Sequence, residues 1–239
     1  MQETCQICDQ APTVDSHLMP QAIGRDIRGD GKSFLIGSLA ANGKLVTQNG
    51  VFDRFLCEAH EKALHAYENY AISFIRSFEL TLDEKRQQSF FRQNTNNEAI
   101  VRFVSSILWR YHTSTRPETA SVRLGGWEPI LRDVTFGGDL AKAPDILVLG
   151  YHSEALPSNR FAIPPSTNKF EDRRVWTFVT NGLAFMAKLD QRSWSASSSS
   201  AVINGRDYIA GAVKEMSRDD LMDMKLIVDR MKAGGKMRF

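Results

Sequence analysis

The chain has 239 residues, 42% of them apolar, so it can bury one large hydrophobic core or two small ones. Its 30 basic and 28 acidic residues leave a net charge of +2, which does not indicate a strong nucleic-acid binder unless cationic side chains cluster at a site. No apolar run approaches the roughly 18 residues of a membrane span. The first residues lack the basic and apolar regions of a signal peptide, so we expect a cytoplasmic protein with reduced thiols.

All three cysteines lie near the start of the chain, in a pattern typical of a zinc site. Cys5 and Cys8 form a C-x2-C pair, and Cys57 and His60 form a C-x2-H pair. Three thiolates and one imidazole are ligands that tetrahedral Zn2+ takes, and a site closed by four protein ligands is structural. The alternatives are a disulfide with one leftover thiol, or three unrelated core cysteines beside an ordinary helical histidine.

Short elements surround this pattern. Residues 13–18 favour a strand, which Pro20 ends because proline has no amide proton to donate to a neighbouring strand. The polar stretch 21–31 indicates a surface loop or a short helix. Apolar side chains at three- and four-residue steps predict a helix over residues 58–78.

A β-hairpin is predicted between the two halves of the zinc pattern. Residues 33–37 and 43–47 flank Asn42-Gly43, which allows the positive φ values of a tight turn. This side of the region is the more basic one. Its basic residues are Arg25, Arg28, Lys32, Lys44 and Arg54. They are either ordinary solvated charges or contacts to phosphate groups.

The order of these motifs resembles that of the HNH (ββα-metal, treble-clef) endonucleases, whose usual form has Asp-His, an Asn and Cys-x2-Cys-His. It is most similar to a bacterial branch with Ser-His, a Cys-Glu variant of Cys-His and a further Glu in the following helix. Those positions here are Ser16-His17, His60-Glu61 and Glu68. The resemblance covers about the first 75 residues and, more loosely, residues 108–110.

The resemblance implies a site for phosphodiester hydrolysis. His17 matches the general base that activates water, and Glu61 stands where a metal-binding histidine usually lies. A carboxylate suits Mg2+ or Mn2+, so Glu61 and Glu68 would surround a catalytic ion. His65 shares their side of the helix, and for it we expect a solvent-exposed position.

Two departures from the family pattern bear on this site. Ser16 replaces an aspartate ligand, and a hydroxyl is a weak partner for a hard cation. Asp15, Asp53 or Glu68 would have to compensate. No residue clearly matches the family's Asn, for which Asp53 is the nearest polar candidate.

The rest of the chain predicts a second core. Residues 81–93 are polar and indicate a connecting helix, and Asn94 to Asn97 cap a buried helix over residues 100–111. From Ser121 the pattern favours strands, among them the buried residues 145–149.

Turn signals then divide the C-terminal part. Asn181-Gly182 predicts a hairpin, and Asn204-Gly205 predicts a weaker one between residues 201–203 and 208–209. Residues 157–170 and 195–200 favour surface loops. The last helix should begin at Ser217 and end before Gly234-Gly235, which completes an α+β domain.

We therefore expect an α+β protein in three parts: a zinc-bound treble-clef/ββα HNH-like module (1–80), a connecting segment (81–97) and an α+β domain of unknown role (98–239). Two functions remain open. One is a metal-dependent endonuclease acting on DNA, in phage defence or a mobile element. The other is a catalytically inactive, zinc-stapled module that binds nucleic acid or protein. The partners expected are nucleic acid, above all DNA, and a protein partner or a second copy of the chain, with no membrane.

Overall fold

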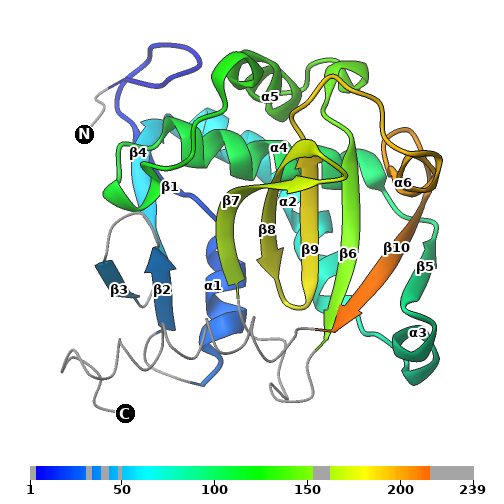
Figure 1. Ribbon diagram of the computed structural model, residues 1–239. Helices are drawn as coiled ribbons and strands as arrows, with labels where there is room; N and C mark the ends of the chain where they lie inside the picture. The colour runs from blue at the N-terminus through cyan, green and yellow to red at the C-terminus, as the bar shows by residue number, and fades with distance from the viewer. Residues whose placement is uncertain (1–3, 31–33, 39–42, 48–49, 153–161, 216–239) are drawn as a thin grey trace.

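The computed structural model describes residues 4–30, 34–38, 43–47, 50–152 and 162–215, with the backbone alone for residues 34–38 and 43–46. The fold is α+β, as expected. Figure 1 shows a six-stranded sheet on the right and two small strand pairs to its left.

The start of the chain forms a short antiparallel strand pair followed by a long helix. β1 (Val14–His17) pairs with β4 (Phe52–Leu56), and α2 (Glu58–Ser77) begins directly after Cys57. α1 (Gln21–Arg28) follows Pro20, so the polar stretch here is a short helix. The predicted first strand and long helix are confirmed.

The hairpin predicted inside the N-terminal region is present as a strand pair. β2 (Phe34–Ser38) and β3 (Gly43–Thr47) are antiparallel, with Phe34 opposite Thr47 and Ser38 opposite Gly43. The turn residues 39–42 lie outside the described part of the chain.

The stretch predicted as a connecting helix is only half helical. α3 (Leu82–Gln87) begins with a capping box between Thr81 and Glu84, but β5 (Ser89–Gln93) is a strand. The prediction of one helix was wrong because Phe90 is buried, which anchors a strand that is too short to show a clear alternation.

The second core helix is confirmed as α4 (Asn97–Thr113), capped by Asn96, whose Oδ1 accepts a hydrogen bond from the Ala99 amide at 3.0 Å. α4 packs against α2 and against α5 (Glu128–Thr135). Short 3-10 turns flank α5 and are η1 (Pro117–Thr119), η2 (Gly125–Trp127) and η3 (Leu140–Lys142).

The large sheet has the strand order β5-β10-β6-β9-β8-β7. Adjacent strands in this sheet are antiparallel, except β10 and β6, which are parallel. The predicted hairpin joins β8 and β9 through Asn181 and Gly182, with φ values of 46° and 79°. The strands not yet bounded are β6 (Ile146–His152), β7 (Ala162–Phe170), β8 (Arg173–Thr180), β9 (Leu183–Lys188) and β10 (Tyr208–Glu215).

Two stretches predicted as surface loops are regular elements. Residues 162–170 form the edge strand β7, whose register shifts between Ile163 and Ser166, around the two prolines. An edge position with an irregular register tolerates proline, which misled the prediction. Ser195 caps the short helix α6 (Ala196–Ala201), so the serine run is a helix and its N-cap. Residues 157–161 lie outside the described part.

The weaker hairpin predicted at Asn204-Gly205 is wrong. Residues 201–203 form no strand, and β10 pairs instead with β5 and β6. The Asn204 side chain ties this segment to β6, since its Oδ1 accepts a hydrogen bond from the Ile146 amide at 2.9 Å. The last predicted helix, over residues 217–233, lies outside the described part of the chain.

The main core is one continuous cluster of buried side chains that runs from Cys5 to Val213. α4 lies in its middle, and Phe103 packs on Phe178 and Phe185 of the sheet with ring centroids 6.1 and 6.0 Å apart. The division at residues 81–97 stays a prediction, which limited proteolysis would test. Among the described residues, no helix is long and apolar enough to cross a membrane.

Candidate functional site

The Cys-x2-Cys turn is held against the strand pair by backbone hydrogen bonds. The Gln6 amide donates to the Phe55 carbonyl at 2.9 Å, and the Asp9 amide donates to the Cys5 carbonyl at 2.9 Å. Cys57 is the N-cap of α2, so His60 lies in the first turn of that helix. The two motifs therefore meet where β4 leads into α2.

The four side chains predicted as zinc ligands come together. Their ligand atoms all lie within 4.8 Å of one another. The Cys8 and Cys57 Sγ atoms are 3.8 Å apart, and the His60 Nδ1 atom is 3.6 Å from the Sγ atoms of Cys5 and Cys8 and 3.2 Å from that of Cys57. A tetrahedral zinc site has S–S edges of about 3.8 Å and S–N edges of about 3.5 Å. The cluster could hold a metal ion and is compatible with structural zinc.

The surroundings of the cluster favour metal binding over a disulfide. All three cysteines are free thiols. Burial opposes ionisation of Cys5, but backbone amides, those of Cys57 and Ile7 foremost, outweigh it and lower the pKa of the Cys5 thiol. The ring of Phe136 covers the edge of His60, with centroids 5.4 Å apart. Phe136 belongs to a distant segment and had no signal in the sequence.

His17 ends β1, opposite Phe52 of β4. Its half-buried ring lies 5.8 Å from the ring of Phe52, which is 42% exposed. The His17 carbonyl accepts a hydrogen bond from Arg110 Nη1 at 2.7 Å. His17 is thus fixed through its backbone to α4 and borders an exposed aromatic side chain.

Glu61 lies in the first turn of α2, next to the fully buried Ser16 of β1. Its Oε2 atom is covered from solvent and has no hydrogen-bond partner, and the same holds for Ser16 Oγ. Burial raises the pKa of Glu61, although Arg110 and Ser16 counteract part of that effect. The Ser16 hydroxyl and the Glu61 carboxylate therefore lie close together, but neither Ser16 Oγ nor Glu61 Oε2 has a hydrogen bond of good geometry to a described residue.

Glu68 has a partner inside the protein. It forms an ion pair with Arg110, a side chain that is 1% exposed. Arg110 also donates to Ser106 Oγ at 3.2 Å. Sequence reasoning placed Glu68 at the ion and noted the region around Arg110 without giving that residue a role. The only signal for this pair is an arginine within the apolar surface of α4.

The other carboxylates named as compensation for Ser16 are engaged elsewhere. Asp53 accepts hydrogen bonds from Ser114 Oγ at 3.0 Å and from the Thr115 amide at 2.8 Å. Burial disfavours its charge, yet these donors outweigh burial and lower the pKa of Asp53. Asp15 pairs with Arg54 at 2.8 Å on the surface.

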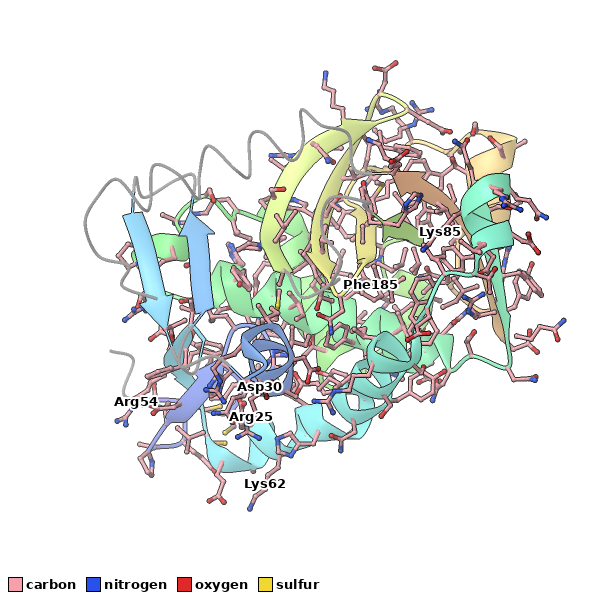
Figure 2. All side chains as sticks on the ribbon, turned by 90° about the horizontal axis from the view of Figure 1, so that it is seen from below. Arg25, Asp30, Arg54, Lys62, Lys85 and Phe185 are labelled. Atoms are coloured by element: carbon pink, nitrogen blue, oxygen red, sulfur yellow. The ribbon has the colours of Figure 1, made fainter. Side chains whose placement is uncertain are left out.

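Figure 2 shows Arg25, Arg54 and Lys62 on the end of the molecule formed by the N-terminal region. Arg25 donates to Gln21 at 2.6 Å, and Arg54 is neutralised by Asp15. The side chains of Lys32 and Lys44 lie outside the described part. His65 is exposed, as expected. The role of the basic residues in phosphate contact stays a prediction.

Comparison with known proteins adds no assignment. No protein-family model, no curated protein and no solved structure matches this chain.

Proposed function

We propose that this chain is an HNH-like, metal-dependent endonuclease that hydrolyses phosphodiester bonds in DNA, in phage defence or in a mobile element. The observation that carries the proposal is that Glu61, the residue after His60 of the Cys/His cluster, lies beside Ser16 of β1. His17 is the next residue of β1, and its role in the proposal comes from the resemblance. The strand pair β1–β4 followed by α2 is the arrangement that a ββα-metal module of the treble-clef type would have, which supports the proposal.

Zinc in this proposal is structural. Cys5, Cys8, Cys57 and His60 would hold it, and four protein ligands leave no position for water or substrate. The metal would lock the Cys-x2-Cys turn to the head of α2 and thereby fix Glu61, the residue after His60. Free thiols of this kind fit the cytoplasmic location that we propose.

The second ion, Mg2+ or Mn2+, fits the oxygen atoms that lack partners. The charge of Glu68 is matched by Arg110, whereas Glu61 has no ion pair with any residue in the described part of the chain. Glu61 and Ser16 would hold the ion. When bound, it would neutralise charge that develops on the scissile phosphate.

The remaining steps of the proposed hydrolysis are carried out by side chains of the protein. The neutral imidazole of His17 takes a proton from the attacking water and so raises its nucleophilicity. Arg110 keeps the carbonyl of His17 in place, and Glu68 keeps Arg110 charged within the core. Glu68 thus acts as a positioning residue in this scheme, while the metal contact rests on Glu61.

One observation favours the second candidate, an inactive module that binds nucleic acid or protein. The Nε2 atom of His17 and the Oε2 atom of Glu61 are both covered from solvent. A substrate reaches them only if the covering side chains move. A module that uses this region for stability alone needs no such movement.

A nicking assay on supercoiled plasmid distinguishes the endonuclease from the inactive module. Wild-type protein is incubated with the plasmid and Mg2+, Mn2+ or EDTA. Glu61→Gln keeps the shape of the side chain and removes its charge, while His65→Ala on the exposed side of α2 serves as the control. We expect nicking by wild type and by His65→Ala with a divalent ion, and none by Glu61→Gln. Binding of DNA without cleavage under all conditions would favour the inactive module.

A further inference from the structure

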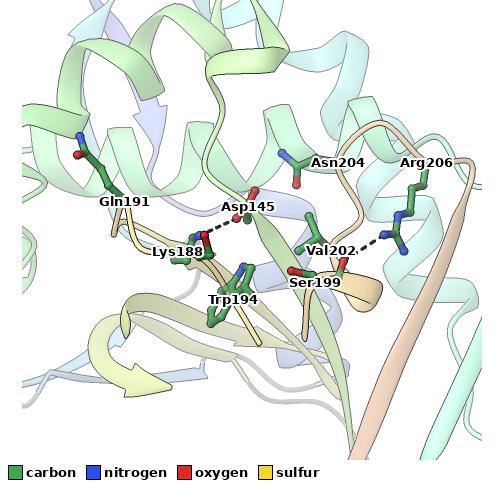
Figure 3. A pocket seen from close by; sticks show the side chains of 9 residues that line it. Asp145, Lys188, Gln191, Trp194, Ser199, Val202, Asn204 and Arg206 are labelled. Atoms are coloured by element: carbon green, nitrogen blue, oxygen red, sulfur yellow. Dashed lines mark hydrogen bonds and ion pairs between the residues drawn. The ribbon is translucent and has the colours of Figure 1, made fainter. Parts of the chain in front are cut away.

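A second site lies at the end of the large sheet, on elements that the proposed function does not use. A pocket of about 330 Å3 opens there, in the size range of small-molecule sites. It lies where β9 ends and β6 begins, beside α6. Figure 3 shows that the side chains of Lys188, Trp194 and Asp145 lie close together on one side of it, with Val202 and Arg206 opposite.

One wall of the pocket, formed by Asn204 and Arg206, is fixed by hydrogen bonds. Asn204 accepts from the Ile146 amide at 2.9 Å and donates to the Pro144 carbonyl at 3.0 Å, which ties this wall to β6. Arg206 Nη2 donates to the Ser199 carbonyl at 3.1 Å and so ties the same wall to α6. A fixed wall loses little conformational entropy when a ligand binds.

Two buried donors at this site have unused hydrogen-bonding capacity. Trp194 is 7% exposed, and its Nε1 atom is covered from solvent and has no acceptor among the residues that the structure describes. The Lys188 ammonium, 5.1 Å from the centre of the Trp194 ring, donates to Asp145 Oδ2 and to the Arg192 carbonyl, both at 2.8 Å. An ammonium has three protons, so one has no acceptor in the described part of the chain. A structural ion pair explains Lys188 but leaves the indole N–H unexplained.

The charges in the lining favour a singly negative ligand. Lys188 and Arg206 are cationic and Asp145 is anionic, so the nine lining residues carry one net positive charge. Val202 and the Trp194 ring add apolar surface. A carboxylate offers two acceptor oxygens for the two donors and carries one charge, whereas a phosphate carries more charge than the lining matches.

We propose that this pocket binds a small organic carboxylate. Its oxygens accept hydrogen bonds from Lys188 Nζ and from Trp194 Nε1, which the ligand reaches when the side chains that cover this atom move, and its apolar part lies against Val202. The site is independent of the proposed nuclease site, because it is built from the end of β9, from α6 and from the loops around them, and contains none of the residues assigned to that chemistry.

The test uses the full chain labelled with 15N at its four tryptophans. Benzoate is the probe, benzamide is its neutral counterpart, and inorganic phosphate is the second anion. We expect millimolar benzoate to move the Trp194 indole N–H resonance in a saturable way, with smaller changes at Trp109, Trp127 and Trp176. Trp194→Phe identifies the resonance. No saturable shift, or an equal shift with benzamide or phosphate, would overturn the proposal.

Equilibrium dialysis with labelled benzoate then separates the two donors. Trp194→Phe keeps an aromatic ring and removes only the N–H, and we expect it to weaken binding about tenfold, the effect of losing one hydrogen bond to a charged group. Lys188→Met should weaken binding at least as much, while Lys169→Met on the exposed surface of β7 should not change it. Wild-type affinity in Trp194→Phe would contradict the assignment, whatever happens to the stability of Lys188→Met.

Discussion

In the N-terminal region, from Cys5 to Ser77, four potential ligand atoms meet within 4.8 Å, whereas the sheet is held by apolar side chains spread over several strands. Loss of any one ligand would open the whole cluster. Loss of one apolar side chain in the sheet leaves its neighbours in contact. The comparison teaches that the first region adds a cluster of four specific side chains to the apolar core that it shares with the rest of the chain, while the sheet relies on apolar packing among many residues.

The largest effect is expected from Cys8→Ala. Structural zinc contributes about 10 kcal/mol or more to the folding of small domains, so this variant should lose the metal and become insoluble. Elemental analysis of wild type should give one zinc per chain. A soluble wild-type preparation without zinc, or a Cys8→Ala variant that melts like wild type, would contradict the dependence on metal.

Removal of a buried aromatic ring from the sheet should lower the stability of the protein without loss of zinc. Phe185 is fully buried and stacks on Phe178 with ring centroids 5.2 Å apart. Phe185→Ala should lower the free energy of unfolding by about 3–5 kcal/mol, measured in urea, with the zinc content unchanged. Phe91→Ala, at a side chain that is 50% exposed, is the control and should have little effect. Loss of zinc in the Phe185 variant would show that the two regions are not separable in this way.

The buried ion pair joins the N-terminal region to α4, the helix that packs on the sheet, since Glu68 is on α2 and Arg110 on α4. Arg110→Met leaves a buried carboxylate without a partner and should cost about 3–5 kcal/mol of unfolding free energy. The double variant Arg110→Met with Glu68→Leu should recover much of this loss. The exposed pair of Lys62 and Glu58 is the control, worth less than about 1 kcal/mol. Equal losses from both pairs would argue against a special role for burial.

The smallest expected effect is the pH dependence of the stability that Glu84 contributes. Hydrogen bonds from Arg92 lower the pKa of Glu84 to about 2, below its ordinary value of 4.5. A carboxyl with a lowered pKa in the folded state stabilises the protein above its unfolded pKa, and this stability is lost as the pH falls toward 2. Glu84→Gln keeps a side chain suited to the capping box. The difference in melting temperature between wild type and Glu84→Gln should therefore shrink below about pH 4.5. A constant difference from pH 7 to pH 3 would contradict the lowered pKa.

The cluster of Cys5, Cys8, Cys57 and His60 was predictable because cysteine is rare in this chain and metal ligands recur at fixed spacings. The helices α2 and α4 were predictable because their apolar periodicity extends over several turns. The Asn181-Gly182 hairpin was predictable because two positive φ values restrict the choice of residue.

What could not be predicted depends on partners distant in the sequence. Arg110 and Glu68 are 42 positions apart, and no local feature of the sequence indicates that their side chains form a pair. β5 and β7 are edge strands with little apolar alternation, so their positions follow from β10 and β8. The pocket around Trp194 combines residues from one strand, one helix and three loops, and no spacing in the sequence brings them together.

The most direct test of the proposed chemistry compares wild type with His17→Ala in one set of measurements: plasmid nicking with Mg2+ or Mn2+, zinc content and melting temperature. His17 is half-buried at a strand end, and its contact with Arg110 uses the backbone, which alanine retains. We expect His17→Ala to lose nicking while it keeps wild-type zinc content and nearly the wild-type melting temperature. Full nicking by His17→Ala, or a loss of nicking that only accompanies unfolding, would contradict the assignment of His17 as the general base.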